Sequence, residues 1–359
     1  MRFAMIDGIR GHLLIGMLVA HMSFIGAIGW TGWFHHKRLI GLFDAEFFIP
    51  LAGFLVGYLF IEKMKDFARF GRFLGRRMAL IYRYYLIAAV PFLVFAVARN
   101  GVEALPQSIL SVLTVQRGGA YSDILPIYLY CFALLLPIGW LVARMGARVV
   151  VPISVAIYAV AFVLQMPGFF GLSGGLVWFN IAAWQLLFCV AFKVGVDHRD
   201  WGRRIAALSR TRYNAALAVS VALVAALTIL PSDAFPLLPA EQNNPNAWVR
   251  QHLHPFYLLH TVAAIVAFTL LLLRREPGTA RVGDALRWYV SLPILRVIGT
   301  YSIQMFTLHV YLIALLMWLA PITDRGTMAV VAVGVFAAFI AAGPAIDYVK
   351  RGRLSRAAA

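Results

Sequence analysis

The chain has 359 residues, of which 62% are hydrophobic and only 13% are charged. A soluble domain carries about a quarter charged residues, so this composition excludes an ordinary soluble protein. The formal net charge of +17 comes largely from basic residues in short segments between apolar stretches. That distribution is typical of membrane orientation and argues against nucleic acid as a partner.

Apolar stretches of membrane-spanning length follow one another along the whole chain. They predict an all-α polytopic membrane protein, with about ten transmembrane helices in one bundle and residues 1–359 as a single domain. The expected spans are Ile9–Trp30, Phe43–Ile61, Ala79–Ala98, Ile124–Val142, Val149–Met166, Leu176–Val194, Tyr213–Leu230, Phe256–Leu273, Leu295–Leu319 and Met328–Val349.

Basic residues are distributed unequally between the two sets of connecting segments. One set, with the C-terminal tail, holds most of them, and the opposite set holds only Lys37, Arg38, Arg99, Arg117, Arg250 and Arg325. By the positive-inside rule, we expect both termini to lie in the cytoplasm. The longest segment on the opposite side is Pro231–Leu253, which is rich in proline and asparagine.

The first apolar stretch carries two ionisable residues, Arg10 and His21, which are eleven residues apart. Eleven residues are close to three helical turns, so both side chains share one face, about 16 Å apart along the axis. Such groups are costly in a bilayer and are functional candidates by default. They offer an anion anchor and a proton acceptor, although Asp7 could instead pair with Arg10 and make it structural.

Further polar residues are expected at one depth, in the outer half of the bundle. Gln185 taken alone is better explained as a helix–helix hydrogen bond, and His260 and His309 are open between structural and functional roles. The residues expected to line the site are Asp44, Asp123, Asn180, Gln185, His260 and His309.

A histidine base oriented by a carboxylate is the chemistry that these residues favour. Glu46 is expected near the depth of His21, where it would hold the imidazole and stabilise its protonated form. The base would deprotonate a hydroxyl as that hydroxyl attacks an activated acyl group. Acyl-CoA is cytoplasmic and highly anionic, and Arg10 near the cytoplasmic edge is a suitable anchor for its phosphates.

We expect neither a metal site nor a permanently bound cofactor. His35 and His36 fall in an outer segment and His252 and His254 in another, and none is expected to join a carboxylate cluster.

Five motifs resemble the acyltransferase-3 membrane superfamily, and most closely its OpgC branch, the succinyltransferases of osmoregulated periplasmic glucans. Alanine (Ala52) stands where that family usually has a serine before the glycine of the second motif. The motifs are IRGHLLIGMLVAH (Ile9–His21), FDAEFFIPLAGFLVGY (Phe43–Tyr58), YSDILPIYLYCF (Tyr121–Phe132), FNIAAWQLLF (Phe179–Phe188) and GTYSIQMFTLHVY (Gly299–Tyr311).

The resemblance implies a ten-span enzyme of the bacterial inner membrane. It would move an acyl group from cytoplasmic acyl-CoA to a hydroxyl of a periplasmic glucan, with His21 as the catalytic histidine and Arg10 on the donor side. The succinyl donor and the glucan acceptor are implied by the OpgC branch alone.

Two other functions are compatible with the same residues. A proton-coupled transporter of glycans or organic anions would use His21, Glu46 and Asp123 as a proton relay. The lack of paired, Pro- or Gly-broken halves disfavours this alternative. A structural or sensory membrane subunit would tolerate His21→Ala.

Overall fold

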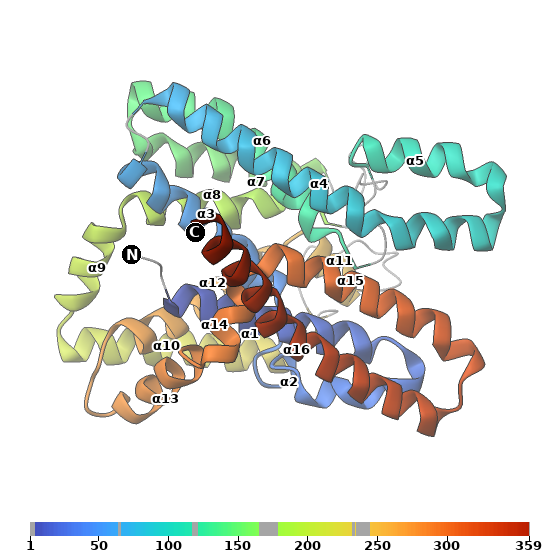
Figure 1. Ribbon diagram of the computed structural model, residues 1–359. Coiled ribbons are helices and arrows are strands. Elements are labelled where there is room, and N and C mark those ends of the chain that lie inside the picture. Colours follow the sequence, from blue (N-terminus) through green and yellow to red (C-terminus); the bar gives the residue numbers. More distant parts are fainter. Residues whose placement is uncertain are drawn as a thin grey trace.

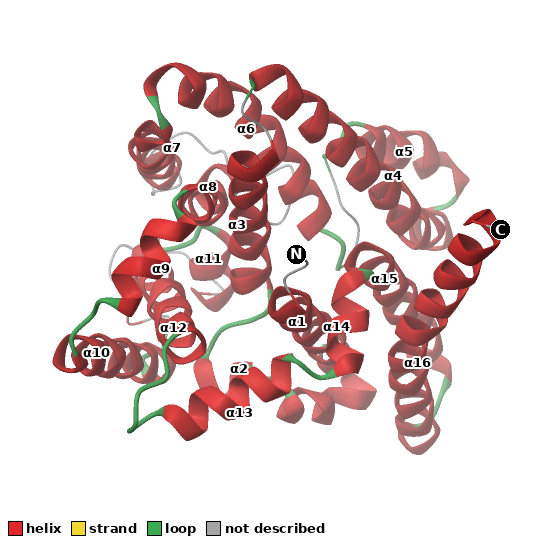
Figure 2. Ribbon diagram, turned by 60° about the vertical axis from the view of Figure 1, so that its left-hand side comes forward, coloured by secondary structure: helices red, strands yellow, loops and turns green. Residues whose placement is uncertain are grey.

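The computed structural model describes residues 4–63, 66–116, 121–164, 179–231, 234 and 245–358. Over this part of the chain the secondary structure is helical, and no strand is present. The helices pack around a large apolar core, with α1 (Ala4–Ser23) between α3, α14 and α15 (Figures 1 and 2). The prediction of an all-α polytopic membrane protein is confirmed.

Seven helical segments within the described residues are long and apolar enough to cross a membrane. An eighth span arises if α8 (Ile181–Val196) and α9 (His198–Ala206), which are bent by 79°, are taken together. The seven are α4 (Phe67–Asn100), α6 (Ile124–Met145), α7 (Val150–Leu164) with the short turn before it, α10 (Arg210–Ile229), α12 (Pro255–Leu273), α15 (Ser302–Leu319) and α16 (Arg325–Ala358).

The count of ten is therefore not exact, although each predicted stretch contains a helix. Two expected spans are not among these segments. The first, α1, carries Asp7, Arg10, His12 and His21, which lower its mean hydropathy. The second is α3 (Ala45–Lys63), in which the described stretch Ala45–Phe60 is an apolar helix.

Short helices connect these long ones and complete the fold. The predicted ninth span begins in a separate helix, α14 (Pro293–Thr300), before α15. The other short helices in the described residues are η1 (Gly26–Phe34), α2 (Lys37–Ile40), η2 (Val102–Ala104), α5 (Leu105–Leu113), η3 (Ala147–Val149), α11 (Pro245–Gln251), α13 (Ala280–Val290) and η5 (Ala320–Ile322).

Glycines let two helix pairs pack with their backbones in contact. A Cβ atom on Gly53 of α3 would lie 2.1 Å from the Phe188 carbonyl oxygen of α8, and one on Gly57 would lie 1.9 Å from that of Phe192. In the second pair, a Cβ on Gly11 of α1 would lie 2.0 Å from the Leu295 carbonyl oxygen of α14. Small residues at such crossings allow close van der Waals packing, which is a main source of helix association in lipid.

The segment between α1 and α3 folds back along α1. Gly16, in the middle of α1, leaves the space that Asp44 occupies, since a Cβ there would lie 2.3 Å from Asp44 Oδ1. Gly41 ends α2 with φ of 67°, and a Cβ on it would lie 2.9 Å from Cε1 of His260 in α12. The fold-back therefore brings the start of α3 beside the middle of α1 and places α2 against α12.

The close crossing of α3 and α8 predicts a position-specific effect of adding one methyl group. We expect Gly53→Ala to lower the free energy of unfolding by about 1–3 kcal/mol, because the rigid carbonyl of Phe188 cannot move aside. Thermal unfolding of the detergent-solubilised protein measures the change. Gly334→Ala in α16 is the matched control, since a Cβ at that position meets no atom within 4 Å. Equal unfolding midpoints for the two variants would contradict the prediction.

Candidate active site

Two histidines from different helices form a hydrogen-bonded pair. The Nδ1 atom of His21 in α1 lies 2.7 Å from the Nε2 atom of His309 in α15. His309 is fully buried, whereas His21 is half-buried. The ring of Tyr121, which precedes α6, covers His21 with 4.5 Å between ring centroids. Three of the motifs identified in the sequence thus meet at His21.

The tautomer of His309 determines which nitrogen of His21 is available for chemistry. Nδ1 of His309 is buried and has no hydrogen-bond partner among the described residues. If that nitrogen carries the proton of His309, then Nε2 of His309 accepts a hydrogen bond from the protonated Nδ1 of His21. His21 then keeps its Nε2 lone pair for a substrate. In the reverse arrangement Nε2 of His21 would carry the ring proton and could not accept another. The first arrangement is therefore the one in which His21 can act as a base.

Glu46 is paired with an arginine and a tyrosine. Nε of Arg250 donates to Glu46 Oε1 at 2.7 Å, and the hydroxyl of Tyr257 donates to the same oxygen at 2.5 Å. Glu46 is fully buried, and a buried carboxylate needs such partners to remain charged. Among the described residues, Glu46 makes these two hydrogen bonds and none to His21, so the structure does not show the predicted contact between Glu46 and the His21 ring.

Arg250 is held in place by the first residues of α8. Its backbone carbonyl accepts a hydrogen bond from Trp184 Nε1 at 3.1 Å, and the next carbonyl, of Gln251, accepts one from the Asn180 amide at 2.9 Å. Its guanidinium lies over the ring of Phe43, 4.3 Å from the centroid. Burial disfavours its charge, but the Glu46 carboxylate raises the pKa of the Arg250 guanidinium. The guanidinium is also within electrostatic range of His21.

Sequence reasoning did not single out Arg250 or Tyr257. Arg250 carried one usable signal, since it is among the few basic residues in segments on the sparsely charged side. Tyr257 carried none, because an aromatic residue near the end of a span is common in membrane proteins.

Three other predicted site residues have structural partners. Gln185 bridges α8 to α7, where it accepts from the Ser154 hydroxyl at 2.7 Å and donates to the Ser154 carbonyl at 2.8 Å. His260 lies 3.3 Å from the Thr228 hydroxyl of α10. Asn180 caps α8 by accepting from the Ala183 amide at 3.2 Å. These contacts fit helix–helix packing, as the sequence already favoured for Gln185.

Two further predicted residues lie outside these pairs. Asp123 immediately precedes α6 and is half-buried. Arg10 lies 3.8 Å from Asp7 and donates a hydrogen bond to the Ser302 hydroxyl at the start of α15. The alternative pairing of Arg10 with Asp7 is thus formed. Arg10 with Ser302, and His21 with His309, connect α1 to α15 at two levels.

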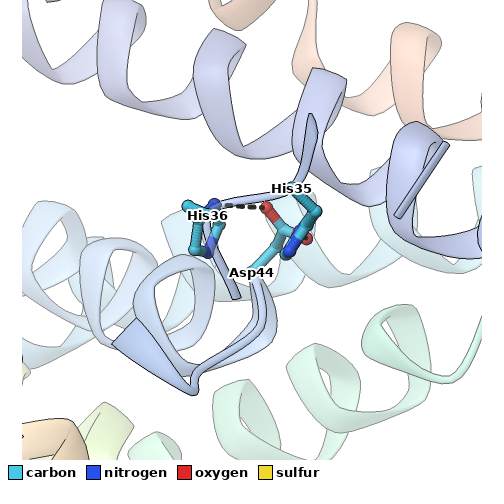
Figure 3. A group of neighbouring side chains, drawn as sticks. All are labelled: His35, His36 and Asp44. Atoms are coloured by element: carbon cyan, nitrogen blue, oxygen red, sulfur yellow. Dashed lines mark hydrogen bonds and ion pairs between the residues drawn. The ribbon is translucent and has the colours of Figure 1, made fainter. Parts of the chain in front are cut away.

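Asp44 belongs to a separate group of side chains (Figure 3). His35 Nε2 lies 2.9 Å from Asp44 Oδ2, and His36 Nδ1 lies 4.0 Å from Asp44 Oδ1. The expectation that His35 and His36 join no carboxylate is wrong. The residues meet because the segment between α1 and α3 folds back, which the sequence spacing does not reveal.

Comparison with known proteins identifies the family of the chain. The family model described as OpgC protein matches residues 2–351. No match was found among curated proteins or solved structures. The wider acyltransferase-3 resemblance stays a prediction. Because the family match spans nearly the whole chain, the chain belongs to the OpgC family, which indicates a glucan-modifying membrane acyltransferase.

Proposed function

We propose that this protein is an O-acyltransferase that moves a succinyl group from cytoplasmic succinyl-CoA to a hydroxyl of a periplasmic glucan. The observation that supports it best is the His21–His309 pair, on a helix that carries Arg10 nearer its other end. The donor, the acceptor and the direction of transfer come from the resemblance to the OpgC branch. The protein would lie in the bacterial inner membrane with both termini in the cytoplasm.

In the proposed reaction, Nε2 of His21 removes the proton from the acceptor hydroxyl. The oxygen attacks the thioester carbonyl, the carbon–sulfur bond breaks, and the departing CoA thiolate takes the proton from the His21 imidazolium. The products are an ester on the glucan and free CoA thiol. Throughout, His309 accepts the Nδ1 proton of His21, which keeps the ring in one orientation and stabilises its charged form.

The distance between Arg10 and His21 suits a CoA thioester that enters from the cytoplasm. Eleven helical residues separate the two by about 16 Å, which is comparable to an extended pantetheine arm. Arg10 would bind the phosphates of the donor, with Asp7 and Ser302 orienting its guanidinium.

Glu46 has an indirect role in this proposal. It holds the Arg250 guanidinium, which lies within electrostatic range of His21 and would favour the negative charge that develops on the thioester oxygen. In this proposal Glu46 is a positioning residue, and Arg250 stabilises the transition state.

A reconstitution assay distinguishes acyl transfer from transport. With purified protein in vesicles, radiolabelled succinyl-CoA and glucan, we expect the label to become covalently attached to the glucan. Alkali should release it, because the bond is an ester. Mass spectrometry of the glucan would locate the group. Movement of glucan across the vesicle without covalent label would favour the transporter alternative and refute the proposed reaction.

The histidine pair predicts a graded loss of turnover. We expect His21→Ala to lower kcat by about 10²–10⁴-fold, the usual contribution of a general base. His309→Ala should lower it by about 10–100-fold, because a hydrogen bond to a charged group is lost. His309→Gln should recover part of the loss, since the amide oxygen can accept from Nδ1. Equal activity of wild type and His309→Ala, at equal protein levels, would exclude this role of His309.

Variants of the Glu46–Arg250 pair should change the stability of the protein and its turnover separately. Glu46→Gln should lower the free energy of unfolding by about 3–5 kcal/mol, because it leaves a buried charge without its counter-ion. Adding Arg250→Met removes that charge and should restore much of the stability while turnover stays low. Thermal unfolding and the succinyl-transfer assay measure the two effects. Recovery of turnover in the double variant would show that the pair is only structural.

A further inference from the structure

A second buried polar cluster lies on the side of α1 away from Arg10 and His21. At about 100° per residue, Gly16 is rotated by about 240° from Arg10, whereas His21 is rotated by only about 20°. Asp44 packs into the space at Gly16, and His35 and His36 surround it (Figure 3). The proposed acyl transfer uses none of these side chains.

The donor atoms of the cluster are close together and incompletely satisfied. One ligand atom each from His35, His36 and Asp44 lies within 4.8 Å of the others. Asp44 is 2% exposed, yet its Oδ1 atom has no hydrogen-bond partner within the described part of the chain. Both ring nitrogens of His36 are also buried there without such a partner. Buried polar atoms are almost always hydrogen-bonded, so unpartnered acceptors that face one another point to a cation.

The kind of donor identifies the class of cation. Two imidazole nitrogens and one carboxylate oxygen suit Zn²⁺ and its neighbours among the divalent transition metals, whereas Mg²⁺ and Ca²⁺ prefer oxygen donors only. We propose that His35, His36 and Asp44 bind a divalent transition-metal ion, with Zn²⁺ as the best fit. His12 borders the cluster, with its ring centroid 5.4 Å from that of His36 and its Nδ1 atom 2.9 Å from the Tyr289 hydroxyl.

Binding of the ion requires a change in His35. The backbone amide of Lys37 donates to His35 Nδ1 at 3.0 Å, so the ring proton lies on Nε2 and is directed to Asp44 Oδ2 at 2.9 Å. The ion replaces this proton at Nε2, and the proton moves to Nδ1. The Lys37 amide then loses its acceptor and turns to solvent, which its exposed position at the start of α2 allows.

The position of the cluster indicates what the ion does. Asp44 immediately precedes α3, and Glu46 follows two residues later. The ion joins η1 and α2, through His35 and His36, to the start of α3, and holds this segment against Gly16 of α1. It therefore fixes the position from which Glu46 reaches Arg250. The ion is structural and does not take part in acyl transfer.

Metal content measured directly tests this proposal. The full-length protein, purified in detergent without a polyhistidine tag and stripped with EDTA, is loaded with Zn²⁺, desalted and analysed by mass spectrometry for the metal. We expect about one equivalent of Zn²⁺ per chain. Co²⁺ in place of Zn²⁺ should give the visible absorption of a site with nitrogen and oxygen ligands. A stripped protein that takes up no Zn²⁺ and gives no Co²⁺ spectrum would overturn the proposal.

Variants establish which residues hold the ion. Asp44→Asn and His36→Gln should each weaken Zn²⁺ binding by more than about 100-fold, because each removes a direct ligand. His36→Cys keeps a zinc ligand and should retain binding. His198→Gln, in α9, is the matched control and should keep the full equivalent. Retention of Zn²⁺ by Asp44→Asn and His36→Gln would also overturn the proposal.

A further variant tests the site without removing a ligand. Gly16→Ala places a methyl group 2.3 Å from Asp44 Oδ1, too close for both to stay in place, so we expect it to reduce Zn²⁺ binding while all three ligands remain. Size-exclusion chromatography confirms that each variant is folded before its metal content is compared. The readout is independent of acyl transfer, so an inactive protein that binds Zn²⁺ would refute the proposed function and leave the metal site intact.

Discussion

The ion pair between Glu46 and Arg250 is the contact on which the candidate site depends. A charge inside an apolar bundle is stable only with a counter-ion, so each member of this pair fixes the position of the other. Glu46 lies in the first turn of α3, which packs on α8 through glycines. In turn, α8 holds the backbone of Arg250 through Trp184. The pair therefore closes a ring of three helices, α3, α8 and α11, around one neutralised charge.

The family motifs acquire separate physical roles in this arrangement. The first and last motifs supply the histidine pair, and the second supplies Glu46 together with the glycines that let α3 approach α8. The fourth, FNIAAWQLLF, holds Arg250 without supplying a charged side chain of its own. The Ala52 substitution lies next to Gly53 in this close crossing. A small side chain is tolerated there, and the ionic contacts described do not use a serine hydroxyl.

Sequence reasoning predicted the features that depend on local composition. Helix positions followed from apolar runs, and the choice of Arg10 and His21 as candidate residues followed from the cost of placing such groups in lipid. Helical spacing already offered Asp7 as a partner of Arg10. The partners on other helices could not be predicted, because they depend on how helices cross. His21 pairs with His309 rather than Glu46, and Asp44 meets His35 only through the fold-back near Gly16. Arg250 lies in a polar connecting segment, where its burial has no local signal.

The sharp bend between α8 and α9 has a mechanical consequence. After Asp197 the chain turns by 79°, and α9 presents Trp201, Arg203 and Arg204 at the surface. Such a composition, in a helix bent sharply away from the one before it, is typical of helices that lie at the lipid headgroups. A helix in that position would anchor α8, and α3 packed against it, so that the two would resist sliding along the membrane normal. A bilayer of unsuitable thickness would then have to deform around this pair.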